Sequence, residues 1–199
     1  MVFNFTEKYN LEDEQVLLRP IEKNDFQYLL PFALQEPEIW KYSLVQAAGE
    51  EGMKSYLDAA LAGRERENEY PFIVFDKRTK TYAGCTRFYD MQLSNKSLQL
   101  GYTWYGKNFQ GTGLNKRCKL LLLSFAFEKM GIERLEFRAD NNNQRSIAAM
   151  KSIGCEVEGV LRSHLPTLDG GRRDSIVLSI LKSEWEHGGK ERLIAKVMV

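Results

Sequence analysis

The sequence has few of the residues that bind metals or form disulfides. Its 199 residues include three cysteines and two histidines, and Cys85, Cys118 and Cys155 form no Cys-x-x-Cys pair. A structural zinc site needs about four cysteine or histidine ligands at short spacing, so we expect no metal. An odd number of scattered cysteines does not indicate a disulfide framework and is typical of a reducing compartment.

Long apolar runs and a surplus of one charge are also absent. The longest apolar run, Leu120 to Leu123, is far shorter than the ~20 residues that a membrane span requires. The first residues contain neither the basic stretch nor the apolar stretch of a signal peptide. The chain has 28 Lys+Arg against 27 Asp+Glu, whereas a nucleic-acid-binding face requires a clustered basic surplus. We therefore expect a cytoplasmic protein that binds neither membranes nor nucleic acid directly.

The composition itself is that of a globular protein, with 43% hydrophobic and 28% charged residues. At roughly 100–200 residues per domain, we expect one domain over residues 1–199, with a short C-terminal extension from about residue 187. No repeat, low-complexity segment or linker divides it. The apolar tail Leu193–Val199 could pack on a partner chain, so a monomer and a homodimer both remain open.

Hydrophobic periodicity predicts an α+β fold. Short apolar or alternating runs predict strands at 16–20, 71–75, 82–88, 98–105 and 134–138, and on both sides of the turn at 169–171. Spacings of three and four residues predict helices from a cap at Asn24 or Asp25, at 50–66, at 114–129 and at 143–153. The three strands between residues 71 and 105 are separated by short polar turns, which predicts an antiparallel meander.

The most informative segment is Gln110-Gly111-Thr112-Gly113, which leads directly into the apolar helix 114–129. The glycines let backbone N–H groups converge on an anion, and the helix N-terminus adds its partial positive charge. This arrangement predicts a cradle for a diphosphate. The spacing is not that of a Walker loop, because Lys116 falls inside the helix. It is not a GxGxxG dinucleotide site either, because that motif lies in a parallel βαβ unit and the preceding strands are predicted to be antiparallel.

Gln110-Gly111-Thr112-Gly113-Leu114-Asn115 resembles the Q/R-x-x-G-x-G/A pyrophosphate loop of the GNAT superfamily of acetyl-CoA-dependent N-acetyltransferases, although Asn115 stands where glycine or alanine is usual. Further stretches resemble the branch that contains the ribosomal-protein alanine N-acetyltransferases. They are Leu100-Gly101-Tyr102, Asn143-Gln144-Arg145-Ser146, Ser152-Ile153-Gly154-Cys155, Glu158-Gly159-Val160-Leu161-Arg162, Asp169-Gly170, Arg173-Asp174 and Glu184-Trp185. The resemblance covers about residues 14–186.

The resemblance implies a mixed, mostly antiparallel seven-stranded sheet with helices on both faces. Strands four and five would splay apart, and the pantetheine arm would lie in the gap and pair with backbone groups of Thr103, Trp104 and Tyr105, a mode that tolerates varied side chains. The diphosphate would be held by Gln110, Gly111, Thr112, Gly113, Leu114, Asn115 and Lys116. Asn143 would bond the cofactor or cap the next helix, and Ser146 would face the thiol end.

The resemblance also implies an acid and a base, and this chain departs from the family at both places. Gln99 on strand four cannot titrate, and Met150 occupies the usual tyrosine position. Glu136 and Asp140, on or just beyond strand five, remain candidates for the base, with Ser146 as a further catalytic candidate. A relay through water stays open. A protein α-amine has a pKa of about 7.7–8.0 against ~10.4 for lysine, so an α-amine needs less help from a base.

The acceptor is the least determined part. Trp40 and Tyr42 could line its groove or anchor a loop. Arg162, His164 and Arg173 could contact an acceptor carboxylate or backbone, and Arg173 could equally form a local ion pair with Asp174, which would contribute little. The leading hypothesis is transfer of acetyl from acetyl-CoA to a peptide or protein N-terminal α-amine, for example that of a ribosomal protein. The alternatives are acetylation of a small-molecule amine (a polyamine, an amino acid or an antibiotic) and a non-catalytic acyl-CoA-binding sensor.

Overall fold

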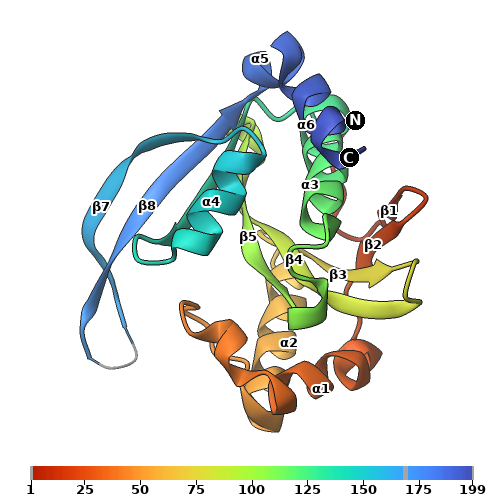
Figure 1. Ribbon diagram of the computed structural model, residues 1–199, viewed down its shortest axis with the longest axis vertical. Coiled ribbons are helices and arrows are strands. Elements are labelled where there is room, and N and C mark those ends of the chain that lie inside the picture. The colour runs from red at the N-terminus through yellow and green to blue at the C-terminus, as the bar shows by residue number, and fades with distance from the viewer. Residues whose placement is uncertain (1, 168–169, 199) are drawn as a thin grey trace.

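The computed structural model describes residues 2–167 and 170–198. Within them, eight strands form one sheet in the order β1-β2-β3-β4-β5-β6-β8-β7 (Figure 1). The strands are β1 (Leu11–Glu12), β2 (Val16–Pro20), β3 (Tyr70–Asp76), β4 (Thr81–Gln92), β5 (Ser97–Tyr105), β6 (Arg134–Asp140), β7 (Glu156–Pro166) and β8 (Arg172–Leu181). The α+β class is confirmed, but the expected seven strands are eight, because the two residues of β1 add an edge strand to β2.

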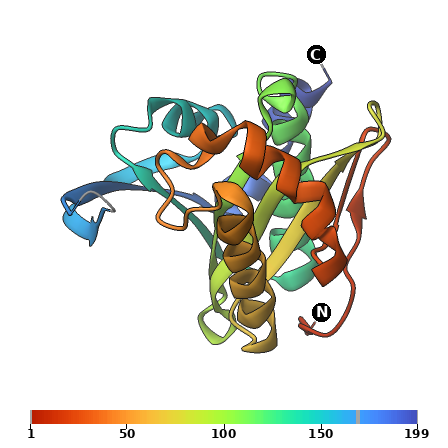
Figure 2. The same cartoon turned by 90° about the horizontal axis from the view of Figure 1, so that it is seen from below.

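Helices cover both faces of the sheet (Figure 2). They are α1 (Phe26–Gln35), α2 (Gly49–Glu65), α3 (Leu114–Ser124, continued by a π-helical turn at Phe125–Met130), α4 (Gln144–Ser152), α5 (Lys182–Glu184) and α6 (Lys190–Val197). Leu29 of α1 and Met53 of α2 belong to the apolar cluster on one face, and Cys118 and Leu122 of α3 to the cluster on the other. None of the helices in the described residues is long and apolar enough to cross a membrane.

The central meander forms as the sequence predicts, since β3, β4 and β5 are successive antiparallel neighbours. The next pair, β5 and β6, is parallel and short: Ser97–Gln99 pairs with Arg134–Glu136, and the pairing ends there. Both strands continue beyond it, to Tyr105 and to Asp140. The expected splay is therefore present, and it begins just after Gln99.

A β-bulge distorts β5 beside this gap. Between the pairs Cys85–Trp104 and Arg87–Gly101, the residues of β4 and β5 fall out of one-to-one register, and Tyr102 has a left-handed φ of +48°. A non-glycine residue in this conformation is uncommon and persists only when its surroundings hold it. Such bulges re-aim the side chains of a strand, here at the edge of the splay.

Two local expectations change in the structure. The Asp25 carboxylate does not cap α1 with its side chain, because it pairs with Arg19 at 2.5 Å and accepts the Glu22 N–H at 2.7 Å. The C-terminal α6 packs on α3, and its Leu193 is 1% exposed. The chain itself thus covers Leu193, whereas Met198 at the other end of the described tail is 76% exposed.

Candidate active site

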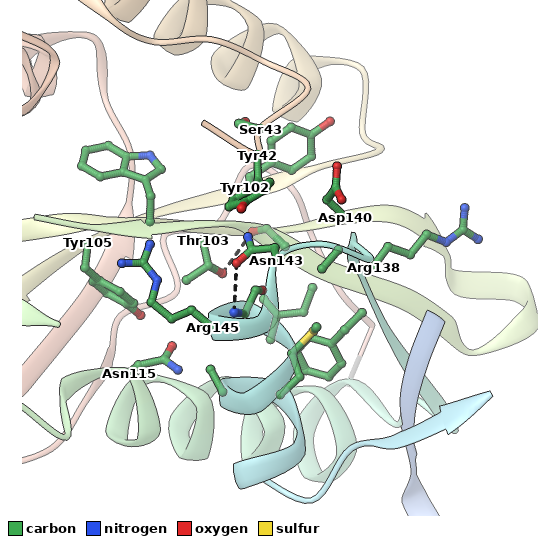
Figure 3. A pocket seen from close by; sticks show the side chains of 18 of the residues that line it. Tyr42, Ser43, Tyr102, Thr103, Tyr105, Asn115, Arg138, Asp140, Asn143 and Arg145 are labelled. Carbon is green, nitrogen blue, oxygen red and sulfur yellow. Dashed lines mark hydrogen bonds between the residues drawn. The ribbon is translucent and has the colours of Figure 1, made fainter. Parts of the chain in front are cut away.

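A large cavity of about 750 Å³ follows the splay between β5 and β6. Its lining comes from both faces of the sheet: Tyr42 and Tyr102 lie on the α2 side of β5, and Asn115 and Arg145 lie on the side of α3 and α4 (Figure 3). The volume falls within the usual range of about 300–1,000 Å³ for small-molecule sites. The gap in the sheet thus connects two half-sites, one on each face.

The glycine loop forms one end of this cavity. Gly111 and Gly113 have φ of +74° and +85°, and a Cβ on either would meet no atom within 4 Å. The backbone therefore needs glycine, and it leaves open space in front of the N-terminus of α3, which favours an anion. The buried Asn115 Oδ1 has no hydrogen-bond partner among the described residues, and Lys116 lines the same end. These features fit a diphosphate.

Not every residue of the loop presents its side chain to the cavity. The Thr112 hydroxyl donates to the Phe109 carbonyl at 2.8 Å, and Leu114 is 1% exposed in the core. Neither lines the cavity, so only their backbone groups can take part in binding there. Gln110 lines it and braces it, because its Nε2 donates to the Tyr105 carbonyl at 2.8 Å.

Arg145 is a charged residue of this end that the sequence did not single out. It lines the cavity from α4, and its Nη1 donates to the Gln110 side chain. The signal was available, because Arg145 lies inside the Asn143–Ser146 motif and a cation beside a glycine cradle favours an anion. Its contact with residue 110, 35 positions earlier, exists only in the folded chain.

The three residues expected to pair with the pantetheine arm all line the cavity, and their side chains point in different directions. The Trp104 ring packs 5.1 Å from that of Trp40 on the α2 side of the sheet. The Tyr105 side chain packs in the core on the α3 side, where burial beside Cys118 raises its pKa well above the usual value. The Thr103 hydroxyl bonds Thr86 at 2.7 Å.

The capping role of Asn143 is confirmed. Its Oδ1 accepts the N–H of Ser146 at 3.1 Å, which makes it the N-cap of α4. Both residues also line the cavity, as does Met150 one turn further along α4. The carboxamide nitrogen of Asn143 can still donate into the cavity, so capping and binding are compatible.

The two candidate bases share one face of β6 but not one environment. Asp140 lines the cavity, is 9% exposed and accepts the Asn142 N–H at 2.8 Å. Glu136 pairs with Arg134 at 2.8 Å and Arg138 at 2.6 Å, and it does not line the large cavity. It lies in the last residue pair of β5 and β6, before the strands part. The structure thus places Asp140 alone of the two at the open splay.

Aromatic side chains dominate the other half-site. Trp40 and Tyr42 line it as the sequence suggested, although Trp40 is 1% exposed and packs on Trp104. Three further tyrosines that the sequence did not assign to the acceptor groove are Tyr56, Tyr89 and Tyr102. They come from α2, β4 and β5 and share no motif, so only the fold reveals that they meet.

The basic residues near β7 and β8 separate into two groups. Arg162 is exposed and does not line the cavity, whereas His164 does. Burial, and then the neighbouring charges of Arg138, Arg173 and Arg172, lower the pKa of His164. Arg173 lines the cavity, is 9% exposed and donates to Ser175 Oγ at 2.9 Å. Among the described residues no carboxylate forms an ion pair with it; Asp169 of the expected C-terminal signature lies outside these residues.

The titratable groups give no sign of a metal centre or a disulfide. Within residues 2–167 and 170–198, no three His, Cys, Asp or Glu residues are grouped to hold a metal ion. Cys85, Cys118 and Cys155 are free and buried, and burial raises the pKa of each thiol.

Comparison with known proteins places this geometry in a family. Residues 15–156 match the family described as acetyltransferase (GNAT) domain. A protein named "Putative ribosomal N-acetyltransferase YdaF", from Bacillus subtilis, is 31% identical over 52% of this chain and 55% of its own length. The "Uncharacterized N-acetyltransferase p20" of Bacillus licheniformis is 26% identical over 88% of this chain and 97% of its own length.

Solved structures of acetyltransferases have the same fold as this chain. The crystal structure of a "putative acetyltransferase" from T. thermophilus superposes with a TM-score of 0.85 at 31% identity, over 98% of this chain and 99% of that one. Mycobacterium smegmatis RimJ in complex with CoA-disulfide superposes with a TM-score of 0.76 at 20% identity, over 95% and 93%, which shows a shared fold. The chain therefore belongs to the acetyltransferase (GNAT) domain family and is an acetyl-CoA-dependent N-acetyltransferase.

Proposed function

We propose that this enzyme acetylates the N-terminal α-amine of a peptide or protein. The observation that carries the proposal is the cavity that runs through the splay, from the glycine cradle on one face to the Asp140 carboxylate on the other. A donor bound at one end and an amine at the other would meet in the gap. The name of one relative, "Putative ribosomal N-acetyltransferase YdaF", supports a ribosomal protein as acceptor.

The donor half-site has the groups that coenzyme A requires. Gly111, Gly113, Asn115 and Lys116 would hold the diphosphate, and the exposed edge of β5 would pair with the pantetheine amides. Bound acetyl-CoA supplies a thioester whose acyl carbon accepts an amine nitrogen. The chain contributes the orientation of the two reactants in the gap.

The acceptor half-site suits a cation that must lose a proton. Asp140 is an anionic group that lines this half-site, where it would bind an ammonium group and take a proton from it. An α-amine ionises near pH ~8 and is easily deprotonated by such a group or by water. The rings of Tyr42, Tyr89 and Tyr102 form walls on which a peptide backbone can lie.

Arg173 favours a second candidate, a free amino acid or another small amine that carries a carboxylate. Its guanidinium is buried and lines the acceptor half-site, where Asp140 interacts with it electrostatically but forms no close ion pair with it among the described residues. A buried guanidinium strongly favours a bidentate carboxylate. In a peptide acceptor the same group would instead bond a backbone carbonyl.

An acceptor panel separates these functions. The enzyme is incubated with acetyl-CoA and either peptides of varied first residue, the matching free amino acids or polyamines, and acceptor-dependent thiol release is measured. Peptides with a blocked α-amine are the matched control. Release with free peptides and not with blocked ones supports the proposal, whereas release with amino acids alone, lost in Arg173→Met, supports the second candidate.

The non-catalytic sensor is tested by the same panel together with calorimetry. Tight binding of coenzyme A with no acceptor-dependent thiol release from any amine would support it and contradict both acetyltransferase proposals. Its basis in the sequence was the substitution of the usual acid and base positions. The structure adds no observation that favours a sensor, because the cavity is open on the acceptor side as well as on the donor side.

A further inference from the structure

Lys119 is a buried lysine that the function described above does not use. It lies on α3 and points at the sheet, where its Nζ is 2.9 Å from Thr103 Oγ1 and 3.4 Å from Thr86 Oγ1. The residue is 4% exposed, and among the described residues no carboxylate pairs with it. Burying a cation without a counter-ion is costly, so an uncharged residue would serve packing better.

The position of Lys119 relates it to the splay. It lines the large cavity, and its Nζ lies 5.9 Å from the ring centre of Phe137, the residue directly after the last paired position of β6. The ammonium group therefore lies on the α3 face of the sheet, bonded to β4 and β5 and facing the Phe137 ring of β6 near the point where β5 and β6 begin to part. The glycine cradle lies beyond the other end of β5, past Tyr105.

This placement matches the reactive end of the donor. An arm held by its diphosphate at Gly111–Lys116 and paired along β5 from Tyr105 toward Thr103 would bring its sulfur to the region of Lys119. The departing thiolate must receive a proton, and the Met150 thioether, which lines the cavity from α4, has no proton to give. Lys119 lines the cavity from α3, on the same face of the sheet as the glycine loop, and its ammonium group can donate a proton.

We propose that Lys119 is the proton donor to the departing thiolate, an assignment that rests on the proposed donor site. The amine lone pair forms the new C–N bond, and the C–S bond breaks with its electron pair on sulfur. A proton passes from Lys119 Nζ to that sulfur. An acceptor that binds as ammonium loses one proton through Asp140 to solvent before the attack, and its nitrogen loses a second proton as the amide forms. Lys119 regains one proton from solvent, so the products are the amide, the free thiol and one released proton.

The surroundings of Nζ suit this task. Desolvation lowers the pKa of Lys119 to about 8, and the ionisable groups that face it are the thiols of Cys118 and Cys155, whose own pKa values burial raises. An ordinary thiol has a pKa near ~8.5, so donor and thiolate are closely matched. The neighbours Thr86 and Thr103 hold the ammonium group by accepting its hydrogen bonds.

The test measures the ionisation of bound coenzyme A and needs no acceptor. The thiolate absorbance of the complex is titrated against pH in the wild type, Lys119→Met and Lys119→Arg. We expect the pKa of the bound thiol to be lower by roughly one unit, about tenfold in its ionisation constant, in the wild type and Lys119→Arg than in Lys119→Met. The matched control Lys54→Met, at an exposed position of α2, keeps the wild-type titration.

Turnover then separates charge from proton donation. Because arginine keeps its proton in proteins, Lys119→Arg should turn over at least tenfold more slowly than the wild type while retaining the wild-type thiol titration. Lys119→Met should fold with an unchanged or higher thermal midpoint, because it removes a buried charge. If the panel finds no acceptor, the thiol titration still decides the Lys119 assignment separately.

Two results would overturn the proposal. One is an identical thiol titration in the wild type and Lys119→Met. The other is the appearance of an acetyl group on Lys119 after incubation with acetyl-CoA, detected by peptide mass analysis, because the side chain would then be an internal acceptor.

Discussion

The guanidinium carbon of Arg87 lies 4.2 Å from the ring centre of Tyr102, the residue with left-handed φ in the bulge of β5. The same guanidinium lies 5.1 Å from the Tyr56 ring and forms an ion pair with Glu69 at 2.5 Å. Arg87 is 3% exposed, so these contacts are desolvated and strong. A buried cation on β4 therefore fixes the strained residue at the edge of the splay.

Loss of this cation should destabilise the fold. Arg87→Met leaves Glu69 half of a broken buried pair, which typically lowers the free energy of unfolding by about 3–5 kcal/mol. Urea denaturation measures the change. Lys8→Met is the control, since Lys8 and Glu22 form an exposed pair, for which about 0–1 kcal/mol is expected. Similar losses in the two variants would contradict the structural role of Arg87.

The glycine cradle predicts a binding defect without a folding defect. Gly113→Val should abolish measurable binding of coenzyme A, because the side chain would fill the space in front of the N-terminus of α3. Gly131→Val is a matched control: Gly131 has a φ of +75°, also lacks neighbours within 4 Å and ends the helix at Met130. Calorimetry measures the affinity of both variants for coenzyme A. Both variants have the same backbone strain, so a loss of affinity in Gly113→Val alone is due to the filled cradle. Unchanged affinity in Gly113→Val would exclude the assignment.

The two acidic residues of β6 should differ in catalysis. If Asp140 is the base, Asp140→Asn should lower turnover by about 10²–10⁴-fold near neutral pH. The loss should shrink as the pH rises, because the acceptor amine is then already neutral. Glu136→Gln, which removes a carboxylate outside the cavity, should keep a rate close to the wild type. Rates of acceptor-dependent thiol release across pH test both; near-wild-type rates in both variants would indicate a relay through water.

Acid stability should depend on Glu158 at the start of β7. The bonds from Arg134 and from Ser179 Oγ lower the pKa of this carboxyl to about 2, against 4.5 for an ordinary glutamate. Because the pKa is lower in the folded state, the stabilisation is present above about pH 4.5 and is lost as the pH falls toward 2. Thermal midpoints of Glu158→Gln and the wild type should differ at neutral pH and converge at pH 2. A constant difference would contradict the linkage.

Much of the fold follows from local pattern. The alternation from Leu98 to Trp104 and the turns of the meander determine strands and neighbours, since short polar connections leave antiparallel pairing as the simple outcome. The glycine loop before α3 is equally local, because left-handed backbone and a helix N-terminus are properties of adjacent residues. The resemblance of this loop to one family predicted the splay that the structure contains. The sequence did not predict the short edge strand β1, because two residues are too few to show an alternation of apolar and polar side chains.

The roles of single side chains depended on tertiary structure. Residue parity on β6 puts Glu136 and Asp140 on one face, but only the point where β5 and β6 part decides which of them meets the cavity. Lys119 sits in a helix whose sequence gives no reason to expect a buried cation, and its contacts with Thr86 and Thr103 join residues 33 and 16 positions apart. Burial and the ending of strand pairing are properties of the assembled sheet. Local pattern is therefore enough to predict the fold class and the glycine loop, whereas the packing of α3 and the divergence of β5 and β6, which bring distant segments together, set which charged side chains line the cavity.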